Sequence, residues 1–446
     1  MTFEAKNGAI YMNDQKVSFR SLNFFGMEEA SGFALHGLWA QPLSTLIGIL
    51  KTNGFNFVRM TLSMEFMLNM DTYKVDYIGA NPQYNGYTAG QLLDVVVKQF
   101  ADAGIAIMFN LHDYGSDGIA ALWYTSAFPE SSVIQAWQIL AKRYINAPNV
   151  IAFDLKNEPH GNCTWGGDAS TDWAAAAERI GNAVLSVNPK LLIFVAGVTP
   201  TSNSIWGDNI SGALTRPIKL NVANKCVLTP HAYKHWNYPS TNGFNNTQYL
   251  DSCFGNVIRQ SGSATVFVGE YGYDETNALD CQWVNEFCNY VNNLGIGGQI
   301  SLWAFNNNSS GNQGLLESDW LTVKPSKMAL VAKYCPNPTH FNFSSTPSPS
   351  PPQPQPTPTP TPAPAPQPSP APGPSSSALS FTVAQQSSWK SGNDTIFQQV
   401  VTVTNTGKTT VKNAVISVSG AKVTSFYSLT QNGNNFSFPS WLVQNG

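Results

Sequence analysis

The segment Val150–Pro159, with the sequence VIAFDLKNEP, begins as an almost continuous apolar run and ends in polar residues and a proline. A run of this kind is typical of a parallel β-strand that is buried on both faces. Seven other segments share this character, so that eight strands are predicted: Val17–Phe25, Phe55–Met60, Ile105–His112, Val150–Glu158, Leu191–Gly197, Cys226–Tyr233, Thr265–Tyr271 and Gln299–Phe305.

Amphipathic segments separate most of these strands and predict helices at Leu43–Thr52, Gln91–Ala103, Val133–Ile145, Asp172–Val187 and Trp283–Leu294. This alternation over residues 1–345 favours an α/β fold, the (β/α)8 TIM barrel. A doubly wound open sheet is the alternative. It is less favoured because no glycine-rich phosphate-binding loop follows the first strand, where Asn23–Gly26 stands instead.

The composition limits the partners that the chain can have. Of its 446 residues, 42% are hydrophobic, 12% are aromatic and only 11% are charged. So many aromatic residues and so few charges exclude a chain that is disordered throughout. The net charge is −3 and no basic cluster occurs, so we expect no nucleic-acid partner. The longest apolar run, residues 191–198, is far shorter than the roughly 20 residues of a membrane span, so we expect no membrane association.

The composition changes sharply after residue 345. Residues 346–377 are almost entirely Pro, Ser, Thr, Gln and Ala, without a charge, which is typical of an extended, disordered polyproline II spacer. An SH3 ligand is the alternative, disfavoured because no Lys or Arg flanks the repeats. Residues 378–446 contain β-branched and aromatic segments separated by Asn-Thr-Gly and Gln-Asn-Gly turns. They predict a small all-β sandwich that could be truncated.

The cysteines and the first residues bear on where the protein works. Residues 1–6 show no basic stretch followed by an apolar one, so they predict no signal peptide. Six cysteines and several Asn-x-Ser/Thr sequons are nonetheless typical of a secreted protein, and we expect a mature secreted form with disulfide bonds. The sequence does not choose among the possible pairings, although Cys281 and Cys288 could not easily pair if both lie on one helix.

In a barrel of this kind, functional residues lie at the carboxyl ends of the strands. Any single polar residue there could simply be in contact with solvent. Recurrence of the same residue types at successive strand ends is better explained by one shared site. In chain order, the candidates are Arg59, His112, Asn157 with Glu158, His231 with Tyr233, Glu270, and Trp303.

Glu158 and Glu270 end the fourth and seventh predicted strands, which face each other across a barrel mouth. Hydrolysis of a glycosidic bond needs one carboxyl group as an acid and a second carboxylate at the anomeric carbon. A separation of about 5 Å would retain the anomeric configuration through a nucleophile, whereas about 6.5–9.5 Å would admit water and invert it. Tyr233 and Arg59, if near Glu270, would keep it ionised, while Glu158 would have to carry its proton. Asn157 could bond to a sugar 2-hydroxyl group.

Other chemistries fit the sequence less well. His231 and His235 have the i, i+4 spacing of a zinc site on a helix, but a strand precedes them and no H-E-x-x-H motif occurs. A serine hydrolase is disfavoured because the chain has no G-x-S-x-G motif. Cys163 could be a nucleophile, although a disulfide or a buried thiol is the simpler interpretation.

Tryptophan side chains stack on the flat C–H faces of pyranose rings while burying a large area. Five of them fall in or beside predicted strand-end loops: Trp39, Trp165, Trp206, Trp236 and Trp303. Of these we expect Trp39, Trp206 and Trp303 to bind sugar, and Trp165 and Trp236 could do so or not. Three others lie in predicted helices and are expected in the core: Trp137, Trp173 and Trp283.

Residues 1–340 resemble glycoside hydrolase family 5, and in particular the endo-β-1,4-glucanases of its first subfamily. The order and the spacing of the motifs both agree with this family. The resemblance rests on Leu22–Gly26, His36–Trp39, Asn56–Arg59, Asn110–His112, Asn157–Pro159, Asp172–Pro189, His231–Tyr233, Gly269–Gly272 and Trp303.

The resemblance implies a retaining (β/α)8 enzyme without a metal or other cofactor. By position it implies Glu158 as the acid/base and Glu270 as the nucleophile. The other implied site residues bind or position the sugar: Asn157 at its 2-hydroxyl group, His231 and Tyr233 beside the glutamates, Arg59 and His112 around the subsite that is cleaved, and Trp303 as the platform there.

Residues 378–446 are similar, more weakly, to the cellulose-binding sandwiches attached to some eukaryotic cellulases. The resemblance rests on Trp389, Val401–Asn405 and Phe436–Trp441, and Trp389 and Trp441 are candidates for the module's binding surface. We therefore expect a secreted, monomeric endo-β-1,4-glucanase that the module holds on cellulose. The alternatives are the same chemistry on mannan, xyloglucan or xylan, and a non-catalytic polysaccharide-binding protein.

Overall fold

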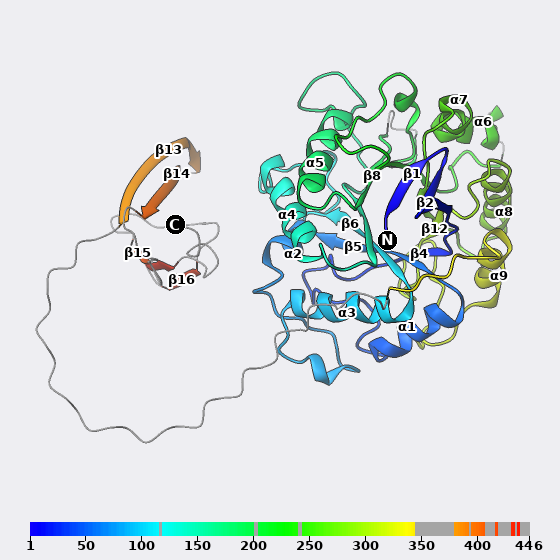
Figure 1. Ribbon diagram of the computed structural model, residues 1–446, viewed down its shortest axis with the longest axis horizontal. Helices are drawn as coiled ribbons and strands as arrows, with labels where there is room; N and C mark the ends of the chain where they lie inside the picture. The colour runs from blue at the N-terminus through cyan, green and yellow to red at the C-terminus, as the bar shows by residue number, and fades with distance from the viewer. Residues whose placement is uncertain are drawn as a thin grey trace, which may run out of the picture. The chain divides into compact units, whose positions relative to one another are not determined.

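The computed structural model describes residues 1–115, 118–199, 204–239 and 243–343, and the backbone of five strands between residues 379 and 437. The chain divides into two compact units, Met1–Gln355 and Pro356–Gly446. The first unit is a barrel of parallel strands with helices around its outside (Figure 1). The predicted spacer at residues 346–377 lies outside the described residues.

The barrel strands follow one another around the sheet in chain order, and the last pairs with the first. Their bounds are β4 (Ser21–Phe24), β5 (Phe57–Ser63), β6 (Ala106–Asp113), β7 (Val150–Asp154), β8 (Leu192–Ala196), β9 (Cys226–Thr229) with β10 (His231–Ala232), β11 (Val268–Tyr271) and β12 (Ile300–Leu302). Pro230 splits the sixth strand because proline has no N–H group for a neighbouring strand. β9 pairs with β8 and β10 with β11, so the sheet closes. The predicted TIM barrel is confirmed, and an open sheet is excluded.

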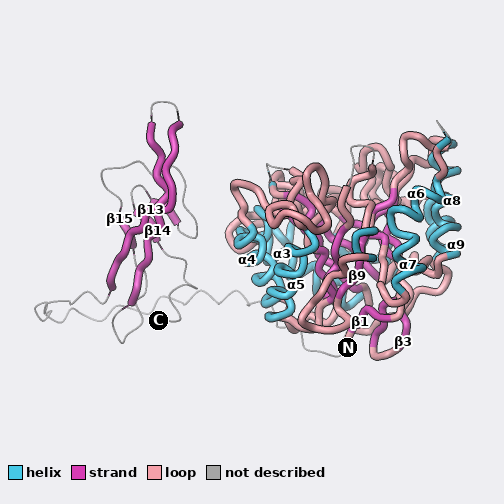
Figure 2. The backbone as a smooth tube through the Cα atoms, turned by 90° about the horizontal axis from the view of Figure 1, so that it is seen from above, coloured by secondary structure: helices cyan, strands magenta, loops and turns pink. Residues whose placement is uncertain are grey.

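The helices cover the outside of the barrel, as both Figure 1 and Figure 2 show. The five predicted helices are present, and Trp137, Trp173 and Trp283 are fully buried in the core as expected. Most of the helices that the sequence did not predict are one or two turns long. The α-helices are α1 (Leu43–Thr52), α2 (Met64–Asn69), α3 (Ala89–Ala103), α4 (Glu130–Arg143), α5 (Trp173–Val187), α6 (Asn246–Leu250), α7 (Asn256–Ser261), α8 (Ala278–Asn293) and α9 (Pro325–Tyr334). Shorter turns are η1 (Pro82–Tyr84), η3 (Ser211–Leu214) and η5 (Asp251–Gly255).

A small N-terminal sheet closes one end of the barrel. It consists of β1 (Phe3–Lys6), β2 (Ala9–Met12) and β3 (Gln15–Lys16), and both ribbon views place it across that end. Its apolar side chains pack with residues such as Phe57, which begins β5, in one buried cluster. The covered end is therefore the amino-terminal end of the strands, and the carboxyl end stays open for a site.

The elements described in the second unit are all β-strands. β13 (Leu379–Ser391) pairs antiparallel with β14 (Asp394–Asn405). β17 (Asn435–Ser437) pairs antiparallel with β15 (Val415–Ser417) and with β16 (Thr430–Asn432). Trp441 lies outside the described residues, and only the backbone of Trp389 is described, within β13.

The six cysteines are all unpaired, which corrects the prediction of disulfide bonds. Two of the sulfur atoms have polar neighbours: the Cys253 Sγ lies 3.4 Å from an Asp208 oxygen, and the Cys335 Sγ lies 3.4 Å from the Ser18 Oγ. Cys163 is a buried thiol. Burial raises its pKa to about 12, so it is not ionised at neutral pH and is a poor nucleophile.

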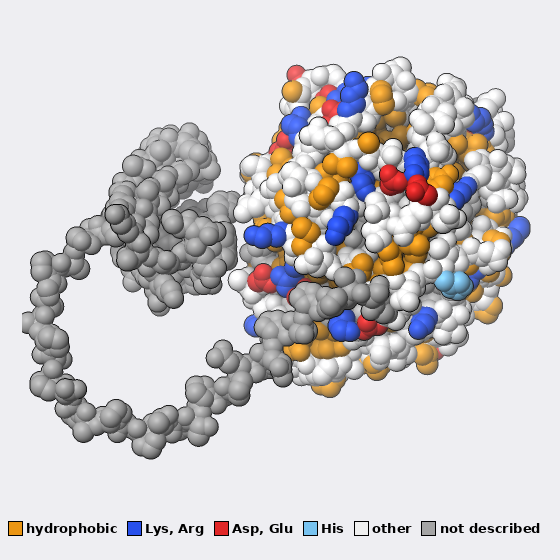
Figure 3. All heavy atoms as spheres, in the orientation of Figure 1, with side chains coloured by type: hydrophobic (Ala, Val, Ile, Leu, Met, Phe, Trp, Pro, Cys, Tyr) orange, Lys and Arg blue, Asp and Glu red, His pale blue; other side chains and the backbone are white. Residues whose placement is uncertain are grey.

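The surface reflects the low content of charged residues. On the face of the first unit shown in Figure 3, acidic and basic side chains are scattered among uncharged ones. Within the described ranges, none of the helices has the length and apolar character needed to span a bilayer.

Candidate active site

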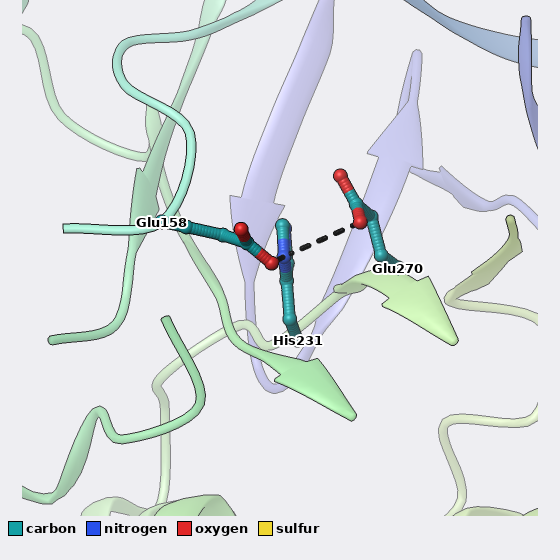
Figure 4. A group of neighbouring side chains, drawn as sticks. All are labelled: Glu158, His231 and Glu270. Carbon is teal, nitrogen blue, oxygen red and sulfur yellow. Dashed lines mark hydrogen bonds and ion pairs between the residues drawn. The ribbon is translucent and has the colours of Figure 1, made fainter. Parts of the chain in front are cut away.

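The residues predicted from the strand ends lie together at the carboxyl end of the barrel. Glu158 follows β7, His231 lies in β10 and Glu270 lies in the neighbouring β11. Figure 4 shows the His231 ring between the two carboxylates. One oxygen of each glutamate and one His231 ring nitrogen all lie within 4.8 Å of one another. The two carboxyl groups that the sequence singled out therefore face a common point.

Glu270 is held as an anion by the groups around it. Arg59 Nη1 lies 2.5 Å from its Oε1, and the Tyr233 hydroxyl donates to its Oε2 at 2.7 Å. Burial of Glu270 raises its pKa, but the positive charges of His231 and Arg59, together with the hydrogen bond from the Tyr233 hydroxyl, outweigh this effect and lower the pKa to about 2. An ionised carboxylate in this position suits a nucleophile.

Arg59 is a buried residue that donates hydrogen bonds to several side chains of the site. It lies in the middle of β5 and is fully buried. Its guanidinium group donates to Asp154 (2.8 Å), Asn23 (2.9 Å) and Asn157 (2.8 Å) as well as to Glu270. Arg59 therefore positions several polar side chains of the site, and it has no exposed atom for contact with sugar.

Glu158 adopts an unusual backbone conformation. Its φ is +48°, in the left-handed region that side chains other than glycine rarely adopt. Gly207 packs directly against it, so that a Cβ atom on Gly207 would lie 3.1 Å from the Glu158 Cα. The His231 Nδ1 lies 2.9 Å from the Glu158 Oε1, and the His160 Nδ1–H donates to the Glu158 carbonyl oxygen at 2.8 Å. The acid candidate is thus fixed at both its backbone and its side chain.

The pKa values of the two histidines at the centre are shifted in opposite directions. Burial lowers the pKa of His231, but the neighbouring Glu270 and Glu158 carboxylates outweigh this and raise it. Its Nδ1 lies 3.6 Å from Glu270 as well, so a positive charge on this ring would offset the repulsion between the glutamates. Burial lowers the pKa of His112 to about 3, so His112 is neutral.

Aromatic rings extend from the centre in two directions. Trp303 stacks on His112, with centroids 5.3 Å apart, and on Phe25 at 5.5 Å. Rings then continue from Phe25 to His36 and to Trp39, which is 38% exposed. Elsewhere on the rim, Trp206 stacks on His160. Trp39 and Trp206 are thus exposed at the mouth, as predicted, whereas the Trp165 indole N–H donates to a backbone carbonyl.

Sequence reasoning missed several residues behind the site. Asn23 and Asp154 are buried partners of Arg59, and each interrupts an apolar strand with a polar residue. A polar residue within an apolar strand was the sequence feature that could have identified them, because a polar side chain in a strand buried on both faces needs a hydrogen-bond partner. Lys156 is also fully buried, donates to the Asn157 carbonyl oxygen, and has its pKa lowered to about 8 by burial. Nothing in the sequence indicated Gly207.

Among the described residues, Glu158, His231 and Glu270 form the group whose atoms could surround a metal ion. Their oxygens already have cationic and hydroxyl partners. The Arg59 guanidinium, 2.5 Å from Glu270, would repel a second cation at that carboxylate. The arrangement therefore suits a pair of carboxyl groups, one acting as an acid and one as a nucleophile, better than metal binding.

Two protein-family models match this chain. Residues 12–309 match the cellulase model of glycosyl hydrolase family 5, and residues 379–445 match the carbohydrate binding domain CBM49. The chain belongs to glycosyl hydrolase family 5. This family 5 cellulase carries a C-terminal CBM49 region, in agreement with the resemblances found in its sequence.

Relatives of this family 5 enzyme are named endoglucanases. It is 36% identical to an endoglucanase of Paenibacillus polymyxa, over 73% of this chain and 85% of that protein. It is 35% identical to the major extracellular endoglucanase of Xanthomonas campestris, over 71% of this chain and 67% of that protein.

Solved structures of such enzymes share the barrel. The catalytic domain of the Xanthomonas campestris endoglucanase covers 75% of this chain and all of that chain, with a TM-score of 0.68 and 32% identity. A Pyrococcus horikoshii endocellulase, solved as a complex with cellotetraose, covers 75% of this chain and 98% of that chain, with a TM-score of 0.69 and 29% identity.

Proposed function

We propose that this enzyme hydrolyses internal β-1,4-glucosidic bonds of cellulose with retention of the anomeric configuration. The observation that carries the proposal is the short distance between the two carboxyl groups. Their facing oxygens lie within 4.8 Å of each other, which matches a retaining pair and leaves too little room for the water of an inverting one.

In the first step, one oxygen of Glu270 attacks the anomeric carbon while the Glu158 carboxyl group gives its proton to the departing glycosidic oxygen. A covalent glycosyl–enzyme intermediate forms on Glu270. In the second step, Glu158 takes a proton from a water molecule, which attacks the same carbon and releases the sugar as the β anomer. Arg59 and Tyr233 hold Glu270 in place, and His231 bridges the two glutamates.

Asn157 supports recognition of a sugar at the centre. Its Oδ1 accepts a hydrogen bond from Arg59, while its Nδ2 has no hydrogen-bond partner in the described part of the chain. A buried donor without a partner is costly unless a ligand satisfies it. The 2-hydroxyl group of the sugar under attack is such a ligand, and this bond strengthens in the transition state of glycoside hydrolysis.

The relatives support a glucan as the substrate. Proteins similar over most of the barrel are named endoglucanases or endocellulases, and one was crystallised with cellotetraose. The CBM49 match points to the same polymer class. We therefore propose that cellulose and soluble β-1,4-glucans are the substrates, and that the enzyme works outside the cell like the relative named extracellular.

The test measures new reducing ends and viscosity on carboxymethylcellulose, with glucomannan, xyloglucan and xylan in parallel. Glu270→Gln and Glu158→Gln should each lower turnover on the preferred substrate at least about a thousandfold, roughly 4 kcal/mol of barrier. NMR of the first product should show the β anomer. A variant that keeps a tenth of the activity would refute the residue roles, and preference for another glycan would change only the substrate.

A further inference from the structure

Four polar atoms inside the barrel, close to the proposed catalytic pair, have no hydrogen-bond partner in the described part of the chain. They are Asn110 Nδ2, Asp154 Oδ1, Thr229 Oγ1 and His231 Nε2, from β6, β7, β9 and β10, and all four residues are fully buried. Buried polar atoms are nearly always paired, either within the protein or with ordered water. These four therefore indicate bound molecules that carry hydrogen-bonding groups.

The four atoms fall into two pairs. A Cβ atom on Gly269 would lie 2.6 Å from the Thr229 Oγ1 and 3.2 Å from the His231 Nε2, so both of these atoms border one point beside the Gly269 backbone. Asn110 and Asp154 are partners in the register of β6 and β7, so their side chains leave the sheet on the same face. Each pair joins a group that can donate to a group that can accept, which is what a bridging water molecule requires.

Neighbouring polar groups in the barrel interior are already paired. The Asn23 Nδ2 donates to the Gly269 carbonyl oxygen at 3.1 Å, and the Ser21 Oγ donates to the Ser301 Oγ at 2.9 Å. Closer to the covered end of the barrel, buried phenylalanine rings pack against one another: Phe19, Phe57, Phe194 and Phe267. Water bound by the unpaired atoms is internal, since it lies between these rings and the catalytic centre.

The two ring nitrogens of His231 have different surroundings. The Nδ1 lies 2.9 Å from Glu158 and 3.6 Å from Glu270, whereas the Nε2 lies on the side of Thr229 and Gly269. A neutral imidazole carries one proton, and the hydrogen bond at one nitrogen decides which nitrogen holds it. An acceptor at Nε2 keeps the proton there, so that Nδ1 can share the proton of the Glu158 carboxyl group.

Several charged or titratable groups interact with the His231 ring: Glu158, Glu270, Arg59, Asp154 and His112. The two glutamates raise the pKa of His231, and Arg59 lowers it. Thr229 carries no charge and does not titrate in the working range of a protein. A change of its hydroxyl group therefore acts on the pH profile through the hydrogen bond at Nε2.

We propose that an internal water molecule bridges each pair, and that the one between Thr229 and His231 decides where the proton of the acid residue lies. This water accepts a hydrogen bond from the His231 Nε2–H and donates one to the Thr229 Oγ1. Nδ1 and Glu158 then share a single proton, which goes to the departing glycosidic oxygen. Thr229 is a positioning residue, and the proposal deepens the hydrolysis mechanism on which it rests.

A high-resolution crystal structure of the enzyme tests the two water sites. It should show water within hydrogen-bond distance of both atoms of each pair. In Thr229→Val the molecule beside His231 should be absent, while the one at Asn110 and Asp154 stays. A pair without water overturns that site, and the proton argument falls with the molecule beside His231. Water that stays beside His231 in the variant overturns the role of Thr229.

Thr229→Val and Thr229→Ser separate the effect of the hydroxyl group from that of side-chain shape. Without the hydroxyl group, the Nε2–H of the charged ring loses its bound acceptor, so the proton shared with Glu158 is held less tightly. In Thr229→Val, kcat/KM on carboxymethylcellulose should fall about tenfold, and its basic limb should move to lower pH by about one unit. Thr229→Ser keeps the hydroxyl group and should behave like wild type.

Thr265→Val is the matched control. Thr265 is buried, and its hydroxyl donates to the Ala9 carbonyl oxygen at 3.3 Å, in the sheet that covers the other end of the barrel. This variant should lose stability without a shift of the basic limb. An unmoved limb in Thr229→Val, or an equal shift in Thr265→Val, overturns the proton argument. Failure of the proposed function shows separately, as wild-type enzyme that cleaves no β-1,4-glucan although its crystal structure contains the water.

Discussion

At the scale of single residues, Arg59 explains why the nucleophile candidate is ionised in a site where burial alone would neutralise it. One guanidinium group contacts Glu270, Asn157 and Asp154. It therefore supplies the positive charge beside the buried Glu270 carboxylate and also fixes the orientation of these three side chains. The sequence identified Arg59 as a strand-end residue, but the number of its partners follows from where three distant strands meet. No spacing along the chain encodes that meeting, so the contact between Arg59 and Asn23 could not be predicted even though Asn23 interrupts an apolar strand.

Tyr233→Phe tests the support of the nucleophile. The hydroxyl at 2.7 Å from Glu270 Oε2 helps to lower the pKa of Glu270, so its removal should raise that pKa. We expect kcat to fall about 10- to 100-fold and the acidic limb of the kcat/KM profile to move to higher pH. pH–rate profiles of both enzymes on carboxymethylcellulose measure this. A lower rate with an unmoved acidic limb would contradict the electrostatic part of the argument.

Glu28→Gln tests a buried carboxyl group in the loop after β4. Burial raises the pKa of Glu28 from 4.5 to about 7, although Thr61 and the Gly26 N–H donate to it. Between pH 4.5 and about pH 7 the Glu28 carboxyl group binds more protons in the native state than in the unfolded state. The free energy of unfolding therefore falls as the pH rises through this range. At pH 8 the free energy of unfolding of the variant should exceed that of wild type by on the order of 3 kcal/mol, so the variant unfolds at a higher temperature, whereas at pH 4 the two should be about equally stable. Thermal unfolding of both proteins at pH 8 and at pH 4 measures this difference in stability. The same difference at both pH values would contradict the prediction.

At the scale of elements, continuous apolar runs predicted every barrel strand, because strands buried on both faces tolerate little else. Long amphipathic helices were found for a similar reason. The helices of five and six residues were not, since one or two turns show no clear period. The N-terminal sheet was missed as well. Its strands have only two to four residues, and its stability comes from the barrel end that it covers.

Ile10→Ala tests that N-terminal sheet. Ile10 is fully buried in β2 and belongs to the cluster that closes the barrel. Its truncation should lower the free energy of unfolding by about 2–5 kcal/mol, while activity at low temperature persists because the proposed catalytic residues lie at the other end. Denaturant unfolding beside an activity assay measures both. Gln15→Ala, at an exposed position of β3, is the control and should change neither.

At the scale of the whole molecule, the chain joins a family 5 barrel to a CBM49 region. We expect the proline-rich residues 346–377 to act as an extended spacer, so the module raises the local concentration of the enzyme on a solid without taking part in catalysis. A chain that ends at residue 345 should then hydrolyse carboxymethylcellulose at the wild-type rate but adsorb more weakly to insoluble cellulose. The barrel is a compact unit, and a related catalytic domain has been solved by itself, so the shortened chain should fold. Depletion from solution by microcrystalline cellulose measures adsorption. Equal adsorption would make the module a structural appendage, while loss of activity on the soluble substrate would show that the two units depend on each other.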